Sequence, residues 1–257
     1  MRIAIDGVYF GLLQGLTTDE LIKLSVDCGS EGLNWPFQEK FDWNDPAAVA
    51  AKLQDAGQTV VSLGLTSHTG AAPEMQGEFR DHVTRSIEVA HVLGTRILDC
   101  WPRRPEGVEK DVAQATLRGN LEALTPALAD GNCTLCIEFE PNTTIENYAE
   151  AVEFLAPYAP HVMITADSYH IIRIGNDLAA AAAACAPQLG IIHFSASTRG
   201  ECGSEGDLCD YDAFLGAALA GGYKGDLLLQ YQPEGDALAS LRRAMAFTRG
   251  VVSRVKA

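Results

Sequence analysis

The chain has 257 residues, with 34 aspartates and glutamates against 19 lysines and arginines, so its formal net charge is −15. This length allows one large α/β domain or two small ones, and it supports a hydrophobic core without disulfides. The acidic balance, with no basic run, excludes a nucleic-acid groove and a polybasic membrane surface, because both need clustered lysine and arginine.

Other features of the composition predict a cytoplasmic protein. The first six residues are too short and too acidic for a signal peptide. No apolar stretch reaches the ~18 residues that a membrane helix requires. The seven cysteines are an odd number scattered over a long chain, which is typical of reduced thiols in a cytosol. We therefore expect neither a membrane nor a nucleic acid as a partner.

Short β-rich runs alternate with helical patterns along the whole chain. Most of these runs are almost continuously apolar, as expected for parallel strands that are covered on both faces. The predicted strands are residues 2–6, 32–34, 59–64, 96–100, 134–140, 162–167, 189–194 and 226–230.

Helices are predicted between these strands, and the first two have recognisable starts. Thr-Thr-Asp-Glu at 17–20 opens one helix, and Asn-Asp-Pro at 44–46 places a cap before a proline in the first turn of the next. The later helices are predicted over residues 79–93, 112–130, 145–155, 177–185, 211–220 and 237–251.

Eight strand–helix units of about 32 residues each predict an α/β protein with a (β/α)8 TIM barrel. A doubly wound open sheet is the alternative, but the first strand is not followed by Gly-x-Gly-x-x-Gly. Neither a linker nor a break in composition divides the sequence. We therefore predict one barrel domain over residues 1–257.

Polar side chains close four successive predicted strands, where a barrel carries its active site. In chain order they are Glu138 with Glu140, Asp167, His193 and Gln230. The two glutamates are two residues apart, so they project from the same side of an extended segment. Oxygen donors with one or two imidazoles suit a divalent cation such as Mn²⁺, Mg²⁺, Co²⁺ or Zn²⁺. Buried charges at a shared rim need a partner or a metal, so these strand ends predict a metal site.

The order and spacing of these motifs resemble the xylose-isomerase-like TIM barrels. That family includes sugar isomerases and epimerases, dehydratases of cyclic polyols and a branch of apurinic endonucleases. Asp-Ser-Tyr-His at 167–170 is similar to the family's Asp-x-x-His, and His193 is similar to its strand-seven histidine. The acidic stretch 205–208 and Gly-Tyr-Lys-Gly at 222–225 are similar to its last loop and the approach to strand eight. The net charge of −15 argues against the endonuclease branch.

The resemblance implies a divalent metal, Mn²⁺ first among the candidates, held by a strand-five glutamate, Asp167, His193 and the residue that closes strand eight. It also implies that His170 binds or polarises the substrate. The substrate would be a small sugar or polyol, and the protein would form a homo-oligomer.

Two positions depart from the family pattern. Strand five offers two glutamates, and Glu138 is the preferred ligand because it ends the apolar run directly. Glu140 would then lie further out, as the base or a substrate contact. Gln230 stands where the family has a glutamate. Its carbonyl oxygen can bind a metal, but the amide carries no charge and cannot act as a base.

Four residues that follow strands three, four and seven are further candidate substrate contacts: His68, Trp101, Arg103 and Arg199. A guanidinium at this rim clamps a carboxylate or phosphate, and an indole packs on a sugar face. The alternatives are surface arginines in an acidic protein and a tryptophan that belongs to the core.

Three functions are compatible with these residues. The leading hypothesis is a metal-assisted sugar or polyol isomerase, in which Glu138 or Glu140 removes a proton next to a carbonyl. The metal and His170 would stabilise the resulting enediolate. The second is a lyase or dehydratase that expels a leaving group from a keto-sugar, a glycoside or a cyclic polyol. The third is a non-catalytic sugar-binding barrel, and Gln230 is the residue that favours it.

Overall fold

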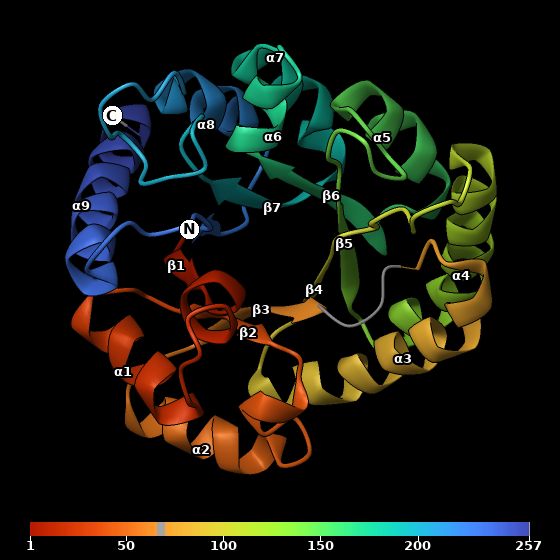
Figure 1. The fold of residues 1–257 in the computed structure, drawn as a ribbon, viewed down its shortest axis with the longest axis horizontal. Coiled ribbons are helices and arrows are strands. Elements are labelled where there is room, and N and C mark those ends of the chain that lie inside the picture. Colours follow the sequence, from red (N-terminus) through yellow and green to blue (C-terminus); the bar gives the residue numbers. More distant parts are fainter. Residues whose placement is uncertain (66–69, 257) are drawn as a thin grey trace.

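The computed structural model describes residues 1–65 and 70–256, in which eight parallel strands close into a barrel (Figure 1). The strands pair in chain order, and β8 closes on β1. They are β1 (Ile3–Asp6), β2 (Leu33–Pro36), β3 (Val60–Leu65), β4 (Ile97–Cys100), β5 (Thr134–Glu138), β6 (Val162–Asp167), β7 (Leu189–Phe194) and β8 (Leu227–Leu229). The predicted α/β TIM barrel is confirmed.

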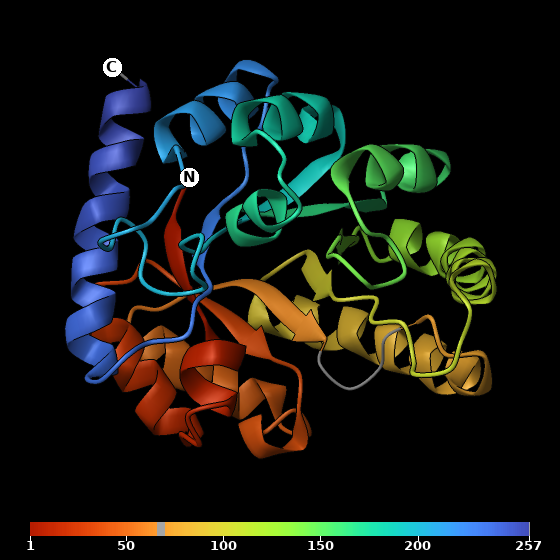
Figure 2. The ribbon, with the colours of Figure 1, turned by 45° about the horizontal axis from the view of Figure 1, so that its top comes forward.

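Helices surround the barrel, and the C-terminal helix closes the ring beside the first one (Figures 1 and 2). They are α1 (Thr18–Asp27), α2 (Pro46–Asp55), α3 (Gln76–Leu93), α4 (Lys110–Asp130), α5 (Tyr148–Leu155), α6 (Ser168–Arg173), α7 (Leu178–Cys185), α8 (Tyr211–Ala220) and α9 (Ala237–Lys256). Short helical turns lie at Val8–Leu12, Glu39–Phe41, Pro73–Met75, Ala156–Tyr158 and Ala186–Gln188. Within the described ranges, every helix is too short or too polar to cross a membrane.

The two predicted helix starts are confirmed by their capping bonds. The Thr17 hydroxyl accepts a hydrogen bond from the backbone N–H of Glu20, whose carboxylate accepts one from the N–H of Thr17. At α2, the carboxylate of Asp45 accepts a hydrogen bond from the backbone of Ala48, and Pro46 is the first helical residue.

The inside of the barrel has an apolar layer beneath a polar one. The apolar layer consists of the buried side chains Ala4, Val61, Cys136, Ile191 and Leu228. Side chains alternate along a strand, so the residue two positions later lies on the same side. On four of these strands that residue is polar: Asp6, Glu138, His193 and Gln230. The strand pattern therefore places a polar layer at the carboxyl end of the barrel.

The chain around the site differs from the predicted boundaries. β5 ends at Glu138 rather than at residue 140, because the backbone N–H of Glu140 donates to Ile145 in the following loop. The helix predicted from residue 145 starts at Tyr148, where the Asn147 side chain caps it. The six-residue α6 was not predicted, and neither was the turn Val8–Leu12.

Candidate active site

A cavity of about 680 Å³ lies at the carboxyl ends of the strands. Its deep wall includes Asp6, Glu138 and Gln230, and its outer wall includes Glu140 and Trp101. This is the end of the barrel at which TIM-barrel enzymes carry their active sites. The volume is in the range of small-molecule sites.

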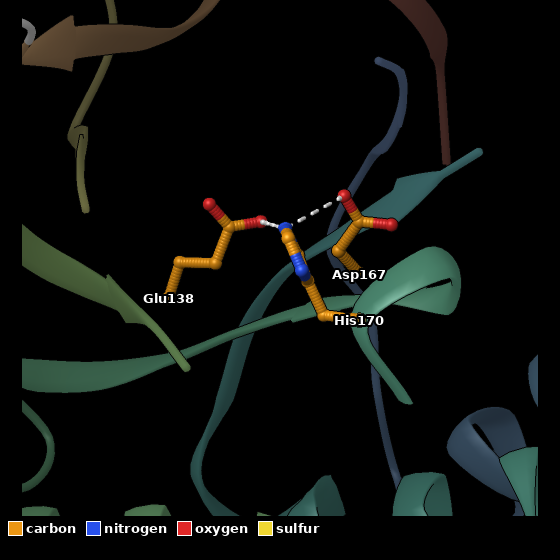
Figure 3. Close-up of side chains that lie close together, drawn as sticks. All are labelled: Glu138, Asp167 and His170. Atoms are coloured by element: carbon orange, nitrogen blue, oxygen red, sulfur yellow. Dashed lines mark ion pairs between the residues drawn. The ribbon is translucent and has the colours of Figure 1, made fainter. Parts of the chain in front are cut away.

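Three buried side chains come together in this part of the barrel: Glu138, Asp167 and His170 (Figure 3). One ligand atom from each lies within 4.8 Å of the other two. The Nε2 of His170 is 3.9 Å from Glu138 Oε1 and also 3.9 Å from Asp167 Oδ2. Two carboxylates and one imidazole form a donor set that suits Mn²⁺ or Zn²⁺.

Local structure positions each of these groups. Glu138 is the last residue of β5 and pairs with Thr165 of β6. Asp167 ends β6 and caps α6, because its Oδ1 accepts a hydrogen bond from the backbone N–H of Tyr169. His170 lies three residues further on, in the first turn of α6. The Asp-x-x-His spacing therefore brings both side chains to one site.

Burial sets the charge of these groups. It raises the pKa of Glu138 to about 7 and lowers the pKa of His170 to about 4. Burial would also raise the pKa of Asp167, but the Arg199 guanidinium and two imidazoles hold it below its ordinary value. At neutral pH His170 is therefore neutral, with a nitrogen lone pair available, while Asp167 is a carboxylate.

His193 is fully buried between two carboxylates. Its Nε2 lies 3.2 Å from Asp99 Oδ2, and its Nδ1 lies 3.4 Å from Glu138 Oε1. Burial lowers the pKa of His193, but the two carboxylates outweigh it and raise that pKa well above its ordinary value. His193 thus connects the cluster of Glu138, Asp167 and His170 to Asp99. Asp99 is the next-to-last residue of β4, and its carboxylate accepts a hydrogen bond from the Thr165 hydroxyl.

Gln230 follows β8 directly, and both ends of its amide are engaged. Its Nε2 donates to Asp6 Oδ2 at 3.0 Å, and its Oε1 accepts from Arg199 Nη2 at 2.8 Å. Arg199 Nη1 also donates to Asp167 Oδ2. The chain of contacts runs from Asp6 through Gln230 and Arg199 to Asp167.

Arg199 is therefore part of the site rather than a surface arginine. Its guanidinium lies 4.9 Å from the ring centres of both Tyr9 and Tyr169, and it donates to the Tyr9 hydroxyl. Its backbone is left-handed, with φ of +66°, which is strained for a residue other than glycine. Such strain is concentrated at functional sites.

Comparison with known proteins places this geometry in a family. The model of the xylose isomerase-like TIM barrel family matches residues 22–250. The chain belongs to this family. A human protein described as a putative hydroxypyruvate isomerase is 24% identical over an alignment of 228 residues, and the match covers 80% of this chain and 80% of the relative.

Solved structures share the fold at low identity. The apo form of a 3-keto-D-glucoside 4-epimerase from E. coli superposes with a TM-score of 0.84 and 18% identity, over 97% of this chain and 99% of the other. The IolI protein, solved with a bound zinc atom, has a TM-score of 0.81 and 15% identity over 99% of both chains.

The remaining predicted substrate contacts lie nearer the opening of the cavity than the cluster of Glu138, Asp167 and His170. Glu140 accepts a hydrogen bond from the Trp101 indole and lies 3.5 Å from Arg173 and 3.8 Å from Nδ1 of His170. Trp101 is 41% exposed, and the Arg103 guanidinium lies over its ring, 5.7 Å from the ring centre. These residues form the mouth of the cavity. His68 falls in 66–69, outside the described residues.

Asp6 and Asp99 were missed as site residues. Both are buried and line the cavity. Each lies at the end of a predicted strand, and this position was the available signal. The strand ends considered for metal ligands were those of β5 to β8, whereas the barrel also brings β1 against β8 and β4 against β5.

The acidic stretch 205–208 contributes a structural residue, Asp207. Its carboxylate accepts hydrogen bonds from three backbone N–H groups, those of Ser197, Gly203 and Cys209, and from the Tyr211 hydroxyl. These bonds outweigh burial and lower the pKa of Asp207. Asp207 therefore organises the loop that carries Arg199.

We expect Asp207→Asn to destabilise the protein by about 2 kcal/mol, because an amide cannot accept all of these charge-assisted bonds. A lowered pKa stabilises the fold above the unfolded pKa, and that stabilisation disappears as the pH falls through the folded pKa. The difference between the two proteins should therefore shrink in acid. Urea unfolding at several pH values measures it. The exposed neighbour Glu205 provides the control, as Glu205→Gln; equal effects of both substitutions would refute this role.

Proposed function

We propose that this protein is a divalent-metal-dependent isomerase of a small sugar or polyol, which transfers a proton next to a carbonyl. One observation carries the proposal. The Oε1 of Glu138 is buried beside Asp167 and His170, and among the described residues it has ion-pair contacts with His193 at 3.4 Å and His170 at 3.9 Å but no well-aligned hydrogen bond. A buried carboxylate oxygen without a good hydrogen bond is costly unless a ligand or a proton uses it.

The residues at this position fit a divalent cation. Glu138, Asp167 and neutral His170 supply the donor atoms, and His193, next to Glu138, is a further imidazole that would bind after losing its proton. Both ring nitrogens of His193 face carboxylates, at 3.2 Å from Asp99 and 3.4 Å from Glu138, without a well-aligned hydrogen bond within the described residues. The zinc in the IolI structure supports a divalent metal in a barrel of this fold. Once bound, such an ion polarises a carbonyl and stabilises negative charge on its oxygen.

The side chains in and around the cluster have separate roles in the proposed reaction. Glu138 is the proton acceptor, because its carboxylate lines the cavity beside His170 and burial raises its pKa above the ordinary value. His170 lies beside Glu138 and lines the cavity, where its ring is positioned to stabilise the developing oxyanion. Glu140, Trp101 and Arg103 contact the outer part of the substrate.

Isomerisation is favoured over inversion at one carbon because Gln230, rather than an acid, closes strand eight. Inversion by two opposed bases needs a second carboxylate, and Gln230 cannot accept a proton in that role. A lyase would begin with the same proton transfer and differ only in the leaving group. The isomerase name of the human relative supports the isomerase, and the epimerase name of the structural relative supports the initial proton transfer.

Turnover after metal exchange tests the proposal. The protein is stripped with a chelator, reloaded separately with Mn²⁺, Mg²⁺, Co²⁺ or Zn²⁺, and incubated with ketoses, keto-inositols and 3-keto-glycosides. We expect the reloaded protein to form an isomer of at least one substrate, and the stripped protein to form none. Binding of a sugar with no conversion under any metal would instead favour the non-catalytic barrel.

A further inference from the structure

The Asp167 carboxylate has both oxygens engaged in this structure. Oδ1 accepts the backbone N–H of Tyr169 that caps α6, and Oδ2 accepts Arg199 Nη1. The capping bond belongs to the fold of α6. A metal ion that binds Asp167 therefore meets the oxygen that the guanidinium already holds.

The Arg199 guanidinium is held against Asp167 by Gln230 and Tyr9, and both of these residues also contact Asp6. Asp6 accepts from Gln230 Nε2 and from the backbone N–H of Tyr9. Gln230 and Tyr9 in turn present their side-chain oxygens to Arg199, each at 2.8 Å. Asp6 thus orients the Gln230 amide with its oxygen toward the guanidinium, and it also binds the backbone of Tyr9, whose hydroxyl accepts from the same guanidinium.

We propose that the Arg199 guanidinium and a divalent cation are alternative occupants of Asp167 in this site. Asp6 and Gln230 are positioning residues that favour the arginine. Two cations at one carboxylate oxygen repel each other, so metal binding requires the guanidinium to withdraw. Arg199 then competes with the cation for Asp167 and weakens metal binding. This inference rests on the metal site of the proposed function.

Replacing Gln230 should change metal affinity in opposite directions, depending on whether it is a metal ligand or holds Arg199. If Gln230 binds the ion, replacing its amide weakens metal binding. If Gln230 holds Arg199 on Asp167, replacing it loosens the arginine and tightens metal binding. Methionine has a similar volume and no strong acceptor, so Gln230→Met separates the two roles.

Mn²⁺ affinity, measured by calorimetry on the full chain after chelation, tests the inference. We expect Arg199→Met to tighten Mn²⁺ binding by at least about tenfold, which is within the usual range of coupling between two binding events. Gln230→Met should change affinity in the same direction. Arg103→Met removes the same charge at the mouth of the cavity, from a side chain stacked on Trp101, and should change affinity less than about twofold.

Two results would overturn the inference alone: equal affinities for Arg199→Met and the unmodified protein, or an equal gain from Arg103→Met. Weaker binding by Gln230→Met would return that residue to the ligands and overturn its assigned role. Failure of every protein to bind Mn²⁺ would overturn the proposed function as well. If Arg199→Met does not fold, Arg199→Lys replaces it. Lysine keeps the charge without the planar fork that bridges Asp167 and Gln230, so it should bind Mn²⁺ more tightly than the unmodified protein.

Discussion

Asp167→Asn should reduce divalent-metal affinity by more than about a hundredfold. Replacing a residue that only contacts a metal ligand costs up to about a hundredfold in known sites, so loss of a ligand should cost more. The amide keeps an oxygen for the capping bond to Tyr169 but removes the negative charge from the centre of the cluster. Turnover should be lost with the metal. Metal content after dialysis against Mn²⁺, together with a calorimetric titration, measures the effect.

Asp177→Asn is the matched control for this change. Asp177 caps α7 in the same way, through a hydrogen bond from the backbone N–H of Ala180, and it is outside the residues that line the cavity. It should bind metal like the unmodified protein. Full metal stoichiometry in Asp167→Asn would contradict the ligand role of this aspartate.

Glu138→Gln should lower the turnover number by about 10²- to 10⁴-fold at saturating metal, the usual contribution of a general base. It should also change how stability depends on pH. A carboxyl whose pKa is raised to about 7 in the fold contributes less to stability as the pH rises from the ordinary carboxyl pKa to about 7. Over that range the stability of Glu138→Gln should therefore fall less with rising pH than that of the unmodified protein. Initial rates and thermal unfolding measure the two effects.

Glu140→Gln makes the same substitution two residues further on. Glu140 lies at the mouth, where it contacts Trp101 and Arg173, so its loss should raise KM more than it lowers kcat. The opposite pattern, with turnover lost at Glu140 and kept at Glu138, would assign the base to Glu140.

The barrel was predictable because its signal is local and repeated. Each strand is a short apolar run, and the gaps between strands contain helices, several of which begin with a side-chain cap, as at Thr17 and Asp45. The same logic located Glu138 and Asp167, since a strand end is visible in the sequence. His170 follows from the Asp-x-x-His spacing within one helical turn.

The contacts around Gln230 could not be predicted in this way. Its partner Asp6 is 224 residues away, and they meet only because β1 pairs with β8. Arg199 reaches Asp167 through a left-handed backbone at a residue other than glycine, which no local pattern indicates. Whether that arginine points inward or to the surface is therefore a property of the folded loop.

Deuterium exchange tests the central claim most directly. A ketose substrate is incubated in D₂O with metal-loaded protein, and the deuterium content of substrate and product is measured by mass spectrometry. We predict incorporation at the carbon next to the carbonyl by the unmodified protein and none by Glu138→Gln. Product that forms in D₂O without solvent deuterium, or equal incorporation by both proteins, would contradict proton transfer through Glu138.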